Sequence, residues 1–251
     1  MPDLQLWSAL NELKTNAYRW VDLTHLLSSE TPHWYGFSAM RTNTLFDFSD
    51  APMKTIEYTL PGQYGTHADV PGHFVPGGRL MHEIDVQEMV YPLCVIDATA
   101  ACAENPDYAL SLCAIQAWEA QYGKIPAGAF VAFRSDWHKR TGDAFENRDS
   151  YGDAHYPGWD LATLKWLVQE RNIGAIGHES PDTDPAARQS ETGFAAEIYI
   201  LSQNRIQVEL LCHLDEVPPS GALIVCAFPK LLGGTGFPAR CFAICPQSAG
   251  A

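Results

Sequence analysis

The chain has 251 residues, 46% of them hydrophobic, which is enough to bury one sizeable core, so we expect a single domain over 1–251. Its formal net charge is −14 at pH 7, and so acidic a surface does not favour binding to nucleic acid or to anionic membranes. No apolar run approaches the roughly 20 residues of a membrane span. The start of the chain, MPDLQ, lacks the basic and apolar segments of a secretion signal, so we expect a cytoplasmic protein.

The predicted elements alternate between helices and strands. In chain order, hydrophobic periodicity predicts a helix over 4–14, strands over 18–23, 55–60 and 91–98, a helix over 111–122, a strand over 129–134, a helix over 159–171, a strand over 173–177, a helix over 194–203, and strands near 207–211, 222–228 and 240–244. Residues 135–157 are expected to be irregular. Seven cysteines without a Cys-x2-Cys pair favour neither a thiolate zinc site nor a disulfide framework. The pattern indicates a mixed α/β fold with a sheet core.

The segment QYGTHADVPGH, at 63–73, gathers one amide, two imidazoles and one carboxylate around a Gly and a Pro. Oxygen and imidazole donors at short spacing are what a divalent cation of the Zn or Mn type requires. His67 and Asp69 are two residues apart, so on a strand they point to one face, and Gln63 shares that face if extended backbone persists through Gly65. We expect the strand over 55–60 to lead into this segment. The alternative is a hydrated loop that is rich in histidine.

This segment resembles the signature of the metal-dependent cyclase family, the family of kynurenine formamidase, isatin hydrolase and trans-dienelactone hydrolase. The signature, His-x-Gly-Thr-His-x-Asp-x-Pro-x-His, is matched everywhere except at its first position, where Gln63 replaces His. The resemblance implies that His67 and Asp69 bind metal and that His73 is the general acid/base. It also implies a swivelling β/β/α, cyclase-like fold with a barrel-like mixed sheet and peripheral helices.

Further metal ligands are expected in the second half of the chain. Glu209 is an acid in the otherwise apolar run IQVELL, where burial costs several kcal/mol unless a cation or hydrogen-bond donors satisfy the carboxylate. The alternative is the wet face of an edge strand. The resemblance implies a His and a Glu twelve residues apart, and Glu197 stands at the position of that His. As a residue of a predicted helix, Glu197 could equally lie on a solvated face.

The candidate ligands Gln63, His67, Asp69, Glu197 and Glu209 offer mainly oxygen donors, because Gln63 and Glu197 stand where the family has imidazoles. Hard oxygen donors favour Mn²⁺, with Zn²⁺ as the alternative. We expect one or two ions, since Asp69 and Glu209 could bridge a pair.

Four residues are candidates for contacting substrate. Trp34 and Phe37 lie in a loop before the motif, where an aromatic side chain could cover a ring, although core or dimer contacts would also explain them. His178 follows a predicted strand, and loops at strand ends commonly line active sites. Arg79 is the cation nearest to the motif and could bind a substrate carboxylate. We treat the remaining histidines as structural: His25, His33, His82, His138, His155 and His213.

The implied activity is metal-dependent hydrolysis of an amide, imide or lactone bond in a small aromatic or cyclic substrate. His73 would take a proton from the attacking water and return it to the leaving nitrogen or oxygen. A dehydrating or ring-closing cyclase on the same site and a non-catalytic metal-dependent binding protein are the alternatives. The expected partners are the small-molecule substrate and further copies of the chain, in a homodimer or homotetramer.

Overall fold

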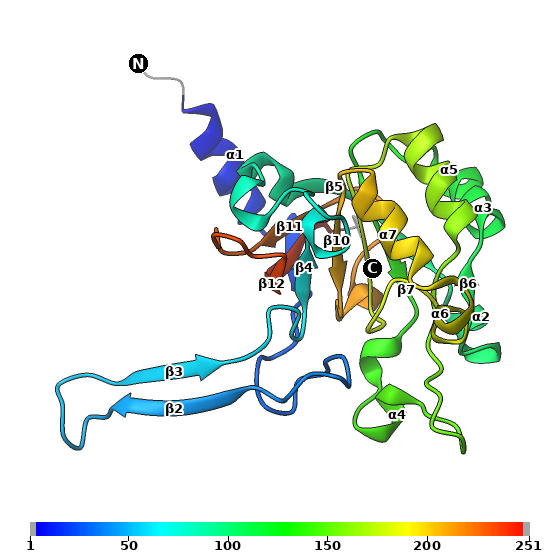
Figure 1. Ribbon diagram of the computed structural model, residues 1–251. Helices are drawn as coiled ribbons and strands as arrows, with labels where there is room; N and C mark the ends of the chain where they lie inside the picture. The colour runs from blue at the N-terminus through cyan, green and yellow to red at the C-terminus, as the bar shows by residue number, and fades with distance from the viewer. Residues whose placement is uncertain (1–3, 248–251) are drawn as a thin grey trace.

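The computed structural model describes residues 4–247, and its centre is a curled nine-stranded mixed sheet (Figure 1). The predicted domain covers 1–251, of which 1–3 and 248–251 lie outside the described residues. Across the sheet the strands are β1 (Tyr18–Asp22), β13 (Arg240–Pro246), β11 (Ala222–Ala227), β5 (Val90–Asp97), β7 (Phe130–Arg134), β9 (Ala175–His178), β10 (Ile206–Glu209), β4 (His67–Asp69) and β12 (Gly236–Pro238). The middle strands β5, β7, β9 and β10 run parallel to one another, and the other neighbours are antiparallel.

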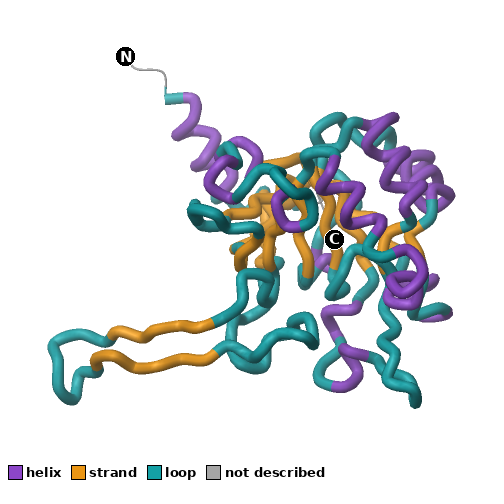
Figure 2. Tube along the Cα trace, in the orientation of Figure 1, coloured by secondary structure: helices purple, strands orange, loops and turns teal. Residues whose placement is uncertain are grey.

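Four helices contribute buried side chains to a core on one face of this sheet: α2 (Thr99–Glu104), α3 (Leu112–Tyr122), α5 (Leu161–Arg171) and α7 (Ala195–Ser202). The structure also contains α1 (Gln5–Leu13), α4 (Asp143–Glu146) and α6 (Ala186–Thr192). Figure 2 shows α3, α5 and α7 gathered on one side of the strands. The prediction of a mixed α/β fold with a barrel-like sheet and peripheral helices is therefore confirmed. The helices α2, α4 and α6 and the short strands β6 (Ala109–Leu110) and β8 (Gly158–Trp159) were not predicted.

The sheet separates two apolar cores. Because successive side chains of a strand point to opposite faces, the central strands β5, β7 and β9 contribute residues to both cores. In β5, Leu93 and Val95 belong to the core on the face away from these helices, whereas Cys94 and Ile96 belong to the core beneath the helices. Strands that bury both faces read as continuous apolar runs, which is why β5 and β7 were predicted within a residue or two of their ends. None of the helices in the described part of the chain is long and apolar enough to span a membrane.

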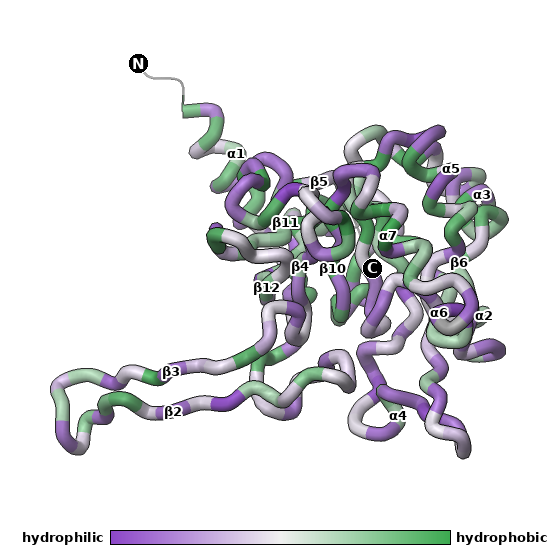
Figure 3. The backbone as a smooth tube through the Cα atoms, viewed as in Figure 1, coloured by the Kyte–Doolittle hydropathy of each residue, from purple (hydrophilic) through white to green (hydrophobic). Residues whose placement is uncertain are grey.

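The strand predicted over 55–60 forms, but it does not lead directly into the 63–73 segment within the sheet. It is β3 (Thr55–Thr59), which pairs with β2 (Arg41–Phe46) in a hairpin that projects from the body of the molecule (Figure 1). Its alternating side chains face solvent on both sides, and apolar residues along the hairpin stay exposed (Figure 3). Periodicity indicates a strand here but says nothing about which partner that strand has.

Candidate metal centre

The pairing of two short strands assembles the centre. In the antiparallel pair β4–β10, His67 lies opposite Glu209 and Asp69 lies opposite Gln207. Because side chains two residues apart share a face, all four polar groups project from one side of the sheet. The residues between them, Ala68 and Val208, point to the other side and join the apolar core there, so burial of these small hydrophobic residues fixes the register.

The His67 imidazole is held with one nitrogen facing the carboxylates. Its Nδ1 is 2.7 Å from the carbonyl oxygen of Gly65, which can only accept a hydrogen bond, so Nδ1 carries the proton. Nε2 then lies 3.3 Å from Asp69 Oδ2 and 3.5 Å from Glu209 Oε2. A hydrogen bond from the second ring nitrogen to a backbone carbonyl is the usual arrangement of a metal-bound histidine.

Helix α7 brings Glu197 over this face of the sheet. Asp184 accepts hydrogen bonds from the backbone N–H groups of Ala196, at 2.9 Å, and Glu197, at 3.0 Å, and so anchors the first turn of the helix. Glu197 is 3% exposed, so the solvated helix face considered from sequence is wrong. Glu209 is 6% exposed on β10, which has neighbours on both edges, so the edge-strand alternative is also wrong.

Burial disfavours the charged form of each of these acids. Burial, together with the charges of Glu197, Asp69 and Asp182, raises the pKa of Glu209 well above its usual range. Burial and the neighbouring acids raise the pKa of Glu197 in the same way, and burial beside Asp184 raises the pKa of Asp182 to about 8. At Asp69, burial also raises the pKa, but the adjacent His67 lowers it overall. Buried like charges of this kind are stable only when protonated or when a cation lies between them.

The side chains present fit a divalent cation. Asp69 Oδ1 is buried and has no hydrogen-bond partner among the residues described. Ligand atoms lie within 4.8 Å of one another in three overlapping groups: His67–Asp69–Glu209, Asp69–His73–Glu197 and Asp182–Glu197–Glu209. Each carboxylate of Asp69, Glu197 and Glu209 belongs to two groups, so the arrangement can accommodate one ion or a bridged pair.

Gln63 and His73 lie at the edge of the centre, before and after β4. The extended backbone expected between Gln63 and His67 is interrupted, because Gly65 adopts a left-handed conformation with φ +61°. Gln63 still reaches the site, where its Nε2 lies 3.5 Å from His73 Nδ1 and 3.3 Å from Thr235 Oγ1. His73 ends the 3-10 turn Pro71–His73, and its Nε2 is 4.0 Å from Glu197 Oε1.

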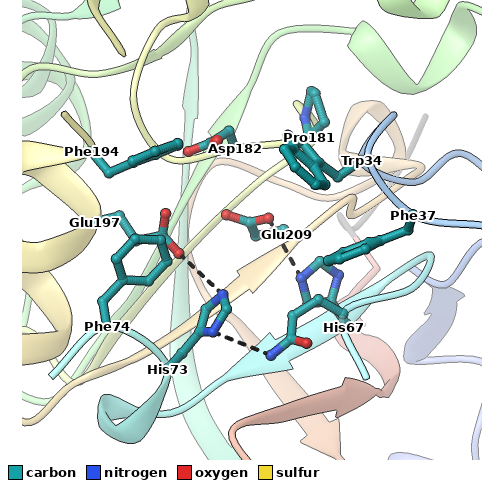
Figure 4. Close-up of a pocket in the computed structure, with 11 residues that line it drawn as sticks. Trp34, Phe37, His67, His73, Phe74, Pro181, Asp182, Phe194, Glu197 and Glu209 are labelled. Atoms are coloured by element: carbon teal, nitrogen blue, oxygen red, sulfur yellow. Dashed lines mark hydrogen bonds and ion pairs between the residues drawn. The ribbon is translucent and has the colours of Figure 1, made fainter. Parts of the chain in front are cut away.

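A cavity of about 280 Å³ opens above these polar groups. Figure 4 shows His67, His73, Glu197 and Glu209 grouped between Phe74 and Phe194 on one side and Trp34 and Phe37 on the other. The apolar part of the wall is formed by Trp34, Phe37, Phe74, Pro181 and Phe194, and the polar part by Gln63, His67, His73, Asp182, Glu197 and Glu209. Trp34 and Phe37, selected from sequence as aromatic covers, therefore do line the cavity, with their rings edge to face at 5.1 Å.

His178 and Arg79, the other two predicted substrate contacts, lie elsewhere. His178 is fully buried behind Glu209, and its Nδ1 accepts a hydrogen bond from the Trp159 indole at 3.3 Å. Its Nε2 therefore carries the proton and faces Glu209 Oε1 at 3.5 Å, and burial lowers the pKa of His178 to about 3. Arg79 forms a two-pronged ion pair with Glu88, so its guanidinium is already neutralised. Neither side chain lines the cavity.

Sequence reasoning missed Gln207 and Asp182. The Gln207 amide nitrogen lies 2.8 Å from Glu197 Oε1, 3.1 Å from Glu209 Oε1 and 3.3 Å from Asp69 Oδ2, so one donor group connects three acids. Its carbonyl oxygen accepts a hydrogen bond from Thr183 at 2.8 Å. The signal was present, because Gln207 stands two residues before Glu209 on the same strand and shares its face.

A curled sheet that carries buried imidazole and carboxylate donors at the base of a cavity forms a candidate metal site of a metal-dependent protein. The family model described as "Cyclase: Putative cyclase" matches residues 21–185. The chain belongs to this cyclase family. A curated relative, the isatin hydrolase of Roseibium aggregatum, is 35% identical over 208 residues, which cover 80% of this chain and 78% of that protein.

Solved structures share the whole fold. Isatin hydrolase A from Labrenzia aggregata, bound to benzyl benzoate, matches with a TM-score of 0.90 and 30% identity, over 97% of this chain and all of that chain. A second isatin hydrolase, bound to the product analogue thioisatinate, matches with a TM-score of 0.90 and 29% identity, over 98% of this chain and all of that chain. The kynurenine formamidase of Bacillus anthracis matches over a shorter segment. It is 26% identical over 82 residues, which cover 32% of this chain and 39% of that protein.

Proposed function

We propose that this protein hydrolyses the ring amide of a small aromatic lactam or imide of the isatin type, with Mn²⁺ as its cofactor and Zn²⁺ as the alternative. The observation that carries the proposal is the direct contact between an aromatic cavity of about 280 Å³ and the buried acids and imidazoles at its base. A fused two-ring substrate is flat and apolar, so it suits such walls, and its carbonyl carbon would face the polar floor. The two related structures named as isatin hydrolases support this substrate class.

The residues of the β4–β10 pair would hold the cation. His67, Asp69 and Glu209 already converge with their ligand atoms, and the cation would relieve the repulsion among the buried acids. When bound, such a cation makes water a stronger acid and polarises a carbonyl group. Gln207 would keep three carboxylates at fixed spacing, since its amide nitrogen contacts one oxygen of each.

His73 is suited to moving the proton. Its side chain is 27% exposed, so it reaches the cavity, and its two ring nitrogens face Gln63 and Glu197 on either side. In this proposal His73 accepts the proton of the attacking water and returns it to the leaving ring nitrogen, so the product carries a carboxylate and an amine. Glu197, 4.0 Å away, would stabilise the imidazolium between these two steps.

The aromatic walls would orient the ring and exclude bulk water from the polar floor. Phe74 and Phe194 lie 5.5 Å apart on one side of the cavity, and Trp34 and Phe37 lie 5.1 Å apart from centre to centre. Figure 4 shows the two pairs on opposite sides of Glu209. A substrate ring held between them would have its reacting carbonyl near His73 and the donor set.

A substrate panel tests the proposal. Protein stripped with a chelator and reloaded with Mn²⁺ or Zn²⁺ would be assayed on isatin, on an N-formyl anilide and on a small lactone. We expect turnover of isatin with metal and none after stripping, and His73→Gln as a matched variant should bind the same metal but lose turnover. Faster turnover of the anilide or the lactone than of isatin would show that the enzyme hydrolyses an open-chain amide or an ester and not the ring amide proposed here. Metal binding without turnover of any substrate would favour the non-catalytic alternative, and ring closure of the open product would favour the cyclase.

A further inference from the structure

A second group of metal-ligating side chains lies outside the centre described above. His138 belongs to the 3-10 turn Trp137–Lys139, and His213 and Asp215 belong to the turn that follows β10. Their ring nitrogens and carboxylate oxygen lie within 4.8 Å of one another. All three were treated as structural or left unassigned from sequence, because 75 residues or more separate the first from the other two.

The His138 ring is held firmly by a buried acid. Glu179 is fully buried, and one of its oxygens accepts hydrogen bonds from the backbone N–H of Ser135, at 2.9 Å, and of Trp137, at 3.2 Å. Its other oxygen lies 2.7 Å from His138 Nδ1, so that nitrogen carries the proton. His138 Nε2 is left facing Asp215 Oδ1 at 3.7 Å. A carboxylate that orients an imidazole in this way is a usual support of histidine ligands.

Asp215 is positioned in a complementary way. Its Oδ2 pairs with Lys139 Nζ at 2.9 Å, whereas its Oδ1 faces His138. The ring centre of His213 lies 5.4 Å from that of His138. His213 and Asp136 both have left-handed backbones, each with φ 57°, at the starts of the two turns. Side chains at such positions are often set for a function.

His25 lies in the wall of a neighbouring cavity of about 350 Å³, which His138 also lines. Its Nε2 is buried and has no hydrogen-bond partner in the part of the chain that the structure describes. Burial lowers the pKa of His25 to about 4, and the charges of His138 and His213 act in the same direction.

We propose that His138, His213 and Asp215 form a second divalent-cation site, next to the cavity that His25 and His138 both line. Two imidazoles and one carboxylate favour Zn²⁺, in contrast to the oxygen-rich set at the first centre. A cation there would join the turn at His138 to the turn after β10, so its role is structural. The site shares no residue with the first centre and does not depend on the proposed activity.

The test uses a variant in which the first centre cannot bind metal, so that any bound ion belongs to the second site. Protein carrying His67→Ala and Asp69→Ala would be titrated with Zn²⁺ by calorimetry and with Co²⁺ by visible absorption, whose intensity reports a four-coordinate site. We expect one ion per chain in this background. Adding His213→Ala should weaken binding at least 10-fold. His213 has a side chain that is 51% exposed, so its removal should not unfold the protein.

His155→Ala in the same background is the matched control, because that ring pairs with Asp107 and Asp149 elsewhere on the molecule. It should leave Zn²⁺ affinity unchanged. Should the His67→Ala, Asp69→Ala background fail to fold, anomalous diffraction at the zinc edge from wild-type crystals would locate the ion directly. An absence of Zn²⁺ binding in the folded background, an unchanged affinity after His213→Ala, or no anomalous peak beside His138 would each overturn the proposal.

Discussion

Glu209 lies directly opposite His67 in the β4–β10 pair, with its Oε2 3.5 Å from His67 Nε2. This relationship depends on register. A slip of one residue would turn both donors toward the core that contains Ala68 and Val208 and would put two apolar side chains beneath the cavity. The apolar residues between the donors are therefore also needed for the site, because they determine which face of the pair is buried against which core.

The first prediction concerns the ligands of that pair. His67→Ala and Asp69→Ala should each abolish binding of Mn²⁺ at the first centre, because each removes a fully buried donor from a group of three. Metal content after gel filtration, measured by plasma mass spectrometry together with circular dichroism, checks this. His82→Ala, whose ring accepts a hydrogen bond from the Gly233 N–H, is the control and should keep the metal. Full Mn²⁺ occupancy in both variants would show that neither His67 nor Asp69 is a metal ligand.

The second prediction separates His73 from the ligands. His73→Ala should retain Mn²⁺ and lose a factor of about 10² to 10⁴ in kcat, which is the usual contribution of a positioned acid or base. KM for the ring substrate should change little, since the aromatic walls remain. Loss of Mn²⁺ with the residual rate unaltered would show instead that His73 is a ligand.

Much of the site could be predicted from short-range patterns. The spacing of His67 and Asp69 gives two donors on one face whatever the strand pairs with, and Glu209 was conspicuous as an acid among apolar neighbours. Glu197 could not be resolved in this way, because its burial depends on Asp184 anchoring α7 over the sheet, a contact across 13 residues of chain. The sequence around Glu197 alone does not show which face of α7 will be buried, because that depends on a contact with the loop that contains Asp184.

The remaining errors have related causes. Residues 55–60 have the alternation of a strand, but only tertiary structure shows that β3 pairs with β2 outside the main sheet. Arg79 was the nearest cation along the chain, yet Glu88 binds it in space. Gln207 was overlooked although its spacing places it on the same face as Glu209. Its contacts with three acids depend on the register of β10 against β4, which is long-range pairing.

The third prediction uses a glycine that packs against the ligands. A methyl group at Gly236 would overlap Asp69 Oδ1 and the Gln63 amide nitrogen. Gly236→Ala should therefore weaken Mn²⁺ binding at least 10-fold by displacing the Asp69 carboxylate, with a smaller effect on the fold because β12 is the last strand of the sheet. Calorimetric titration together with thermal melting checks this. Unchanged Mn²⁺ affinity in a folded variant would mean that Asp69 does not need its observed position to bind metal.

The fourth prediction concerns self-association. The β2–β3 hairpin exposes Phe48 to 71% and Tyr58 to 58%, and we expect a second copy of this chain to cover them in a homodimer or homotetramer. Phe48→Ser with Tyr58→Ser should reduce the assembly to a smaller species in sedimentation velocity at micromolar concentration. Leu232→Ser, which alters a side chain that is 88% exposed on a distant loop, is the control and should sediment like the wild type. A wild-type monomer would contradict the expectation outright.

The fifth prediction tests the two positions at which this chain departs from the cyclase signature. Gln63 contacts His73 and Thr235, and Glu197 contacts Gln207, so both border the centre with oxygen-bearing side chains. Gln63→His with Glu197→His would replace an amide and a carboxylate by two imidazoles, which are softer donors, and would remove one buried negative charge. We expect Zn²⁺ affinity to rise relative to Mn²⁺ by a factor of 10 or more. Competition titration with both ions in the His213→Ala background, which removes the proposed second site, gives the ratio. If the ratio stays unchanged in a folded protein, neither position touches the metal, and His67, Asp69 and Glu209 are its protein ligands.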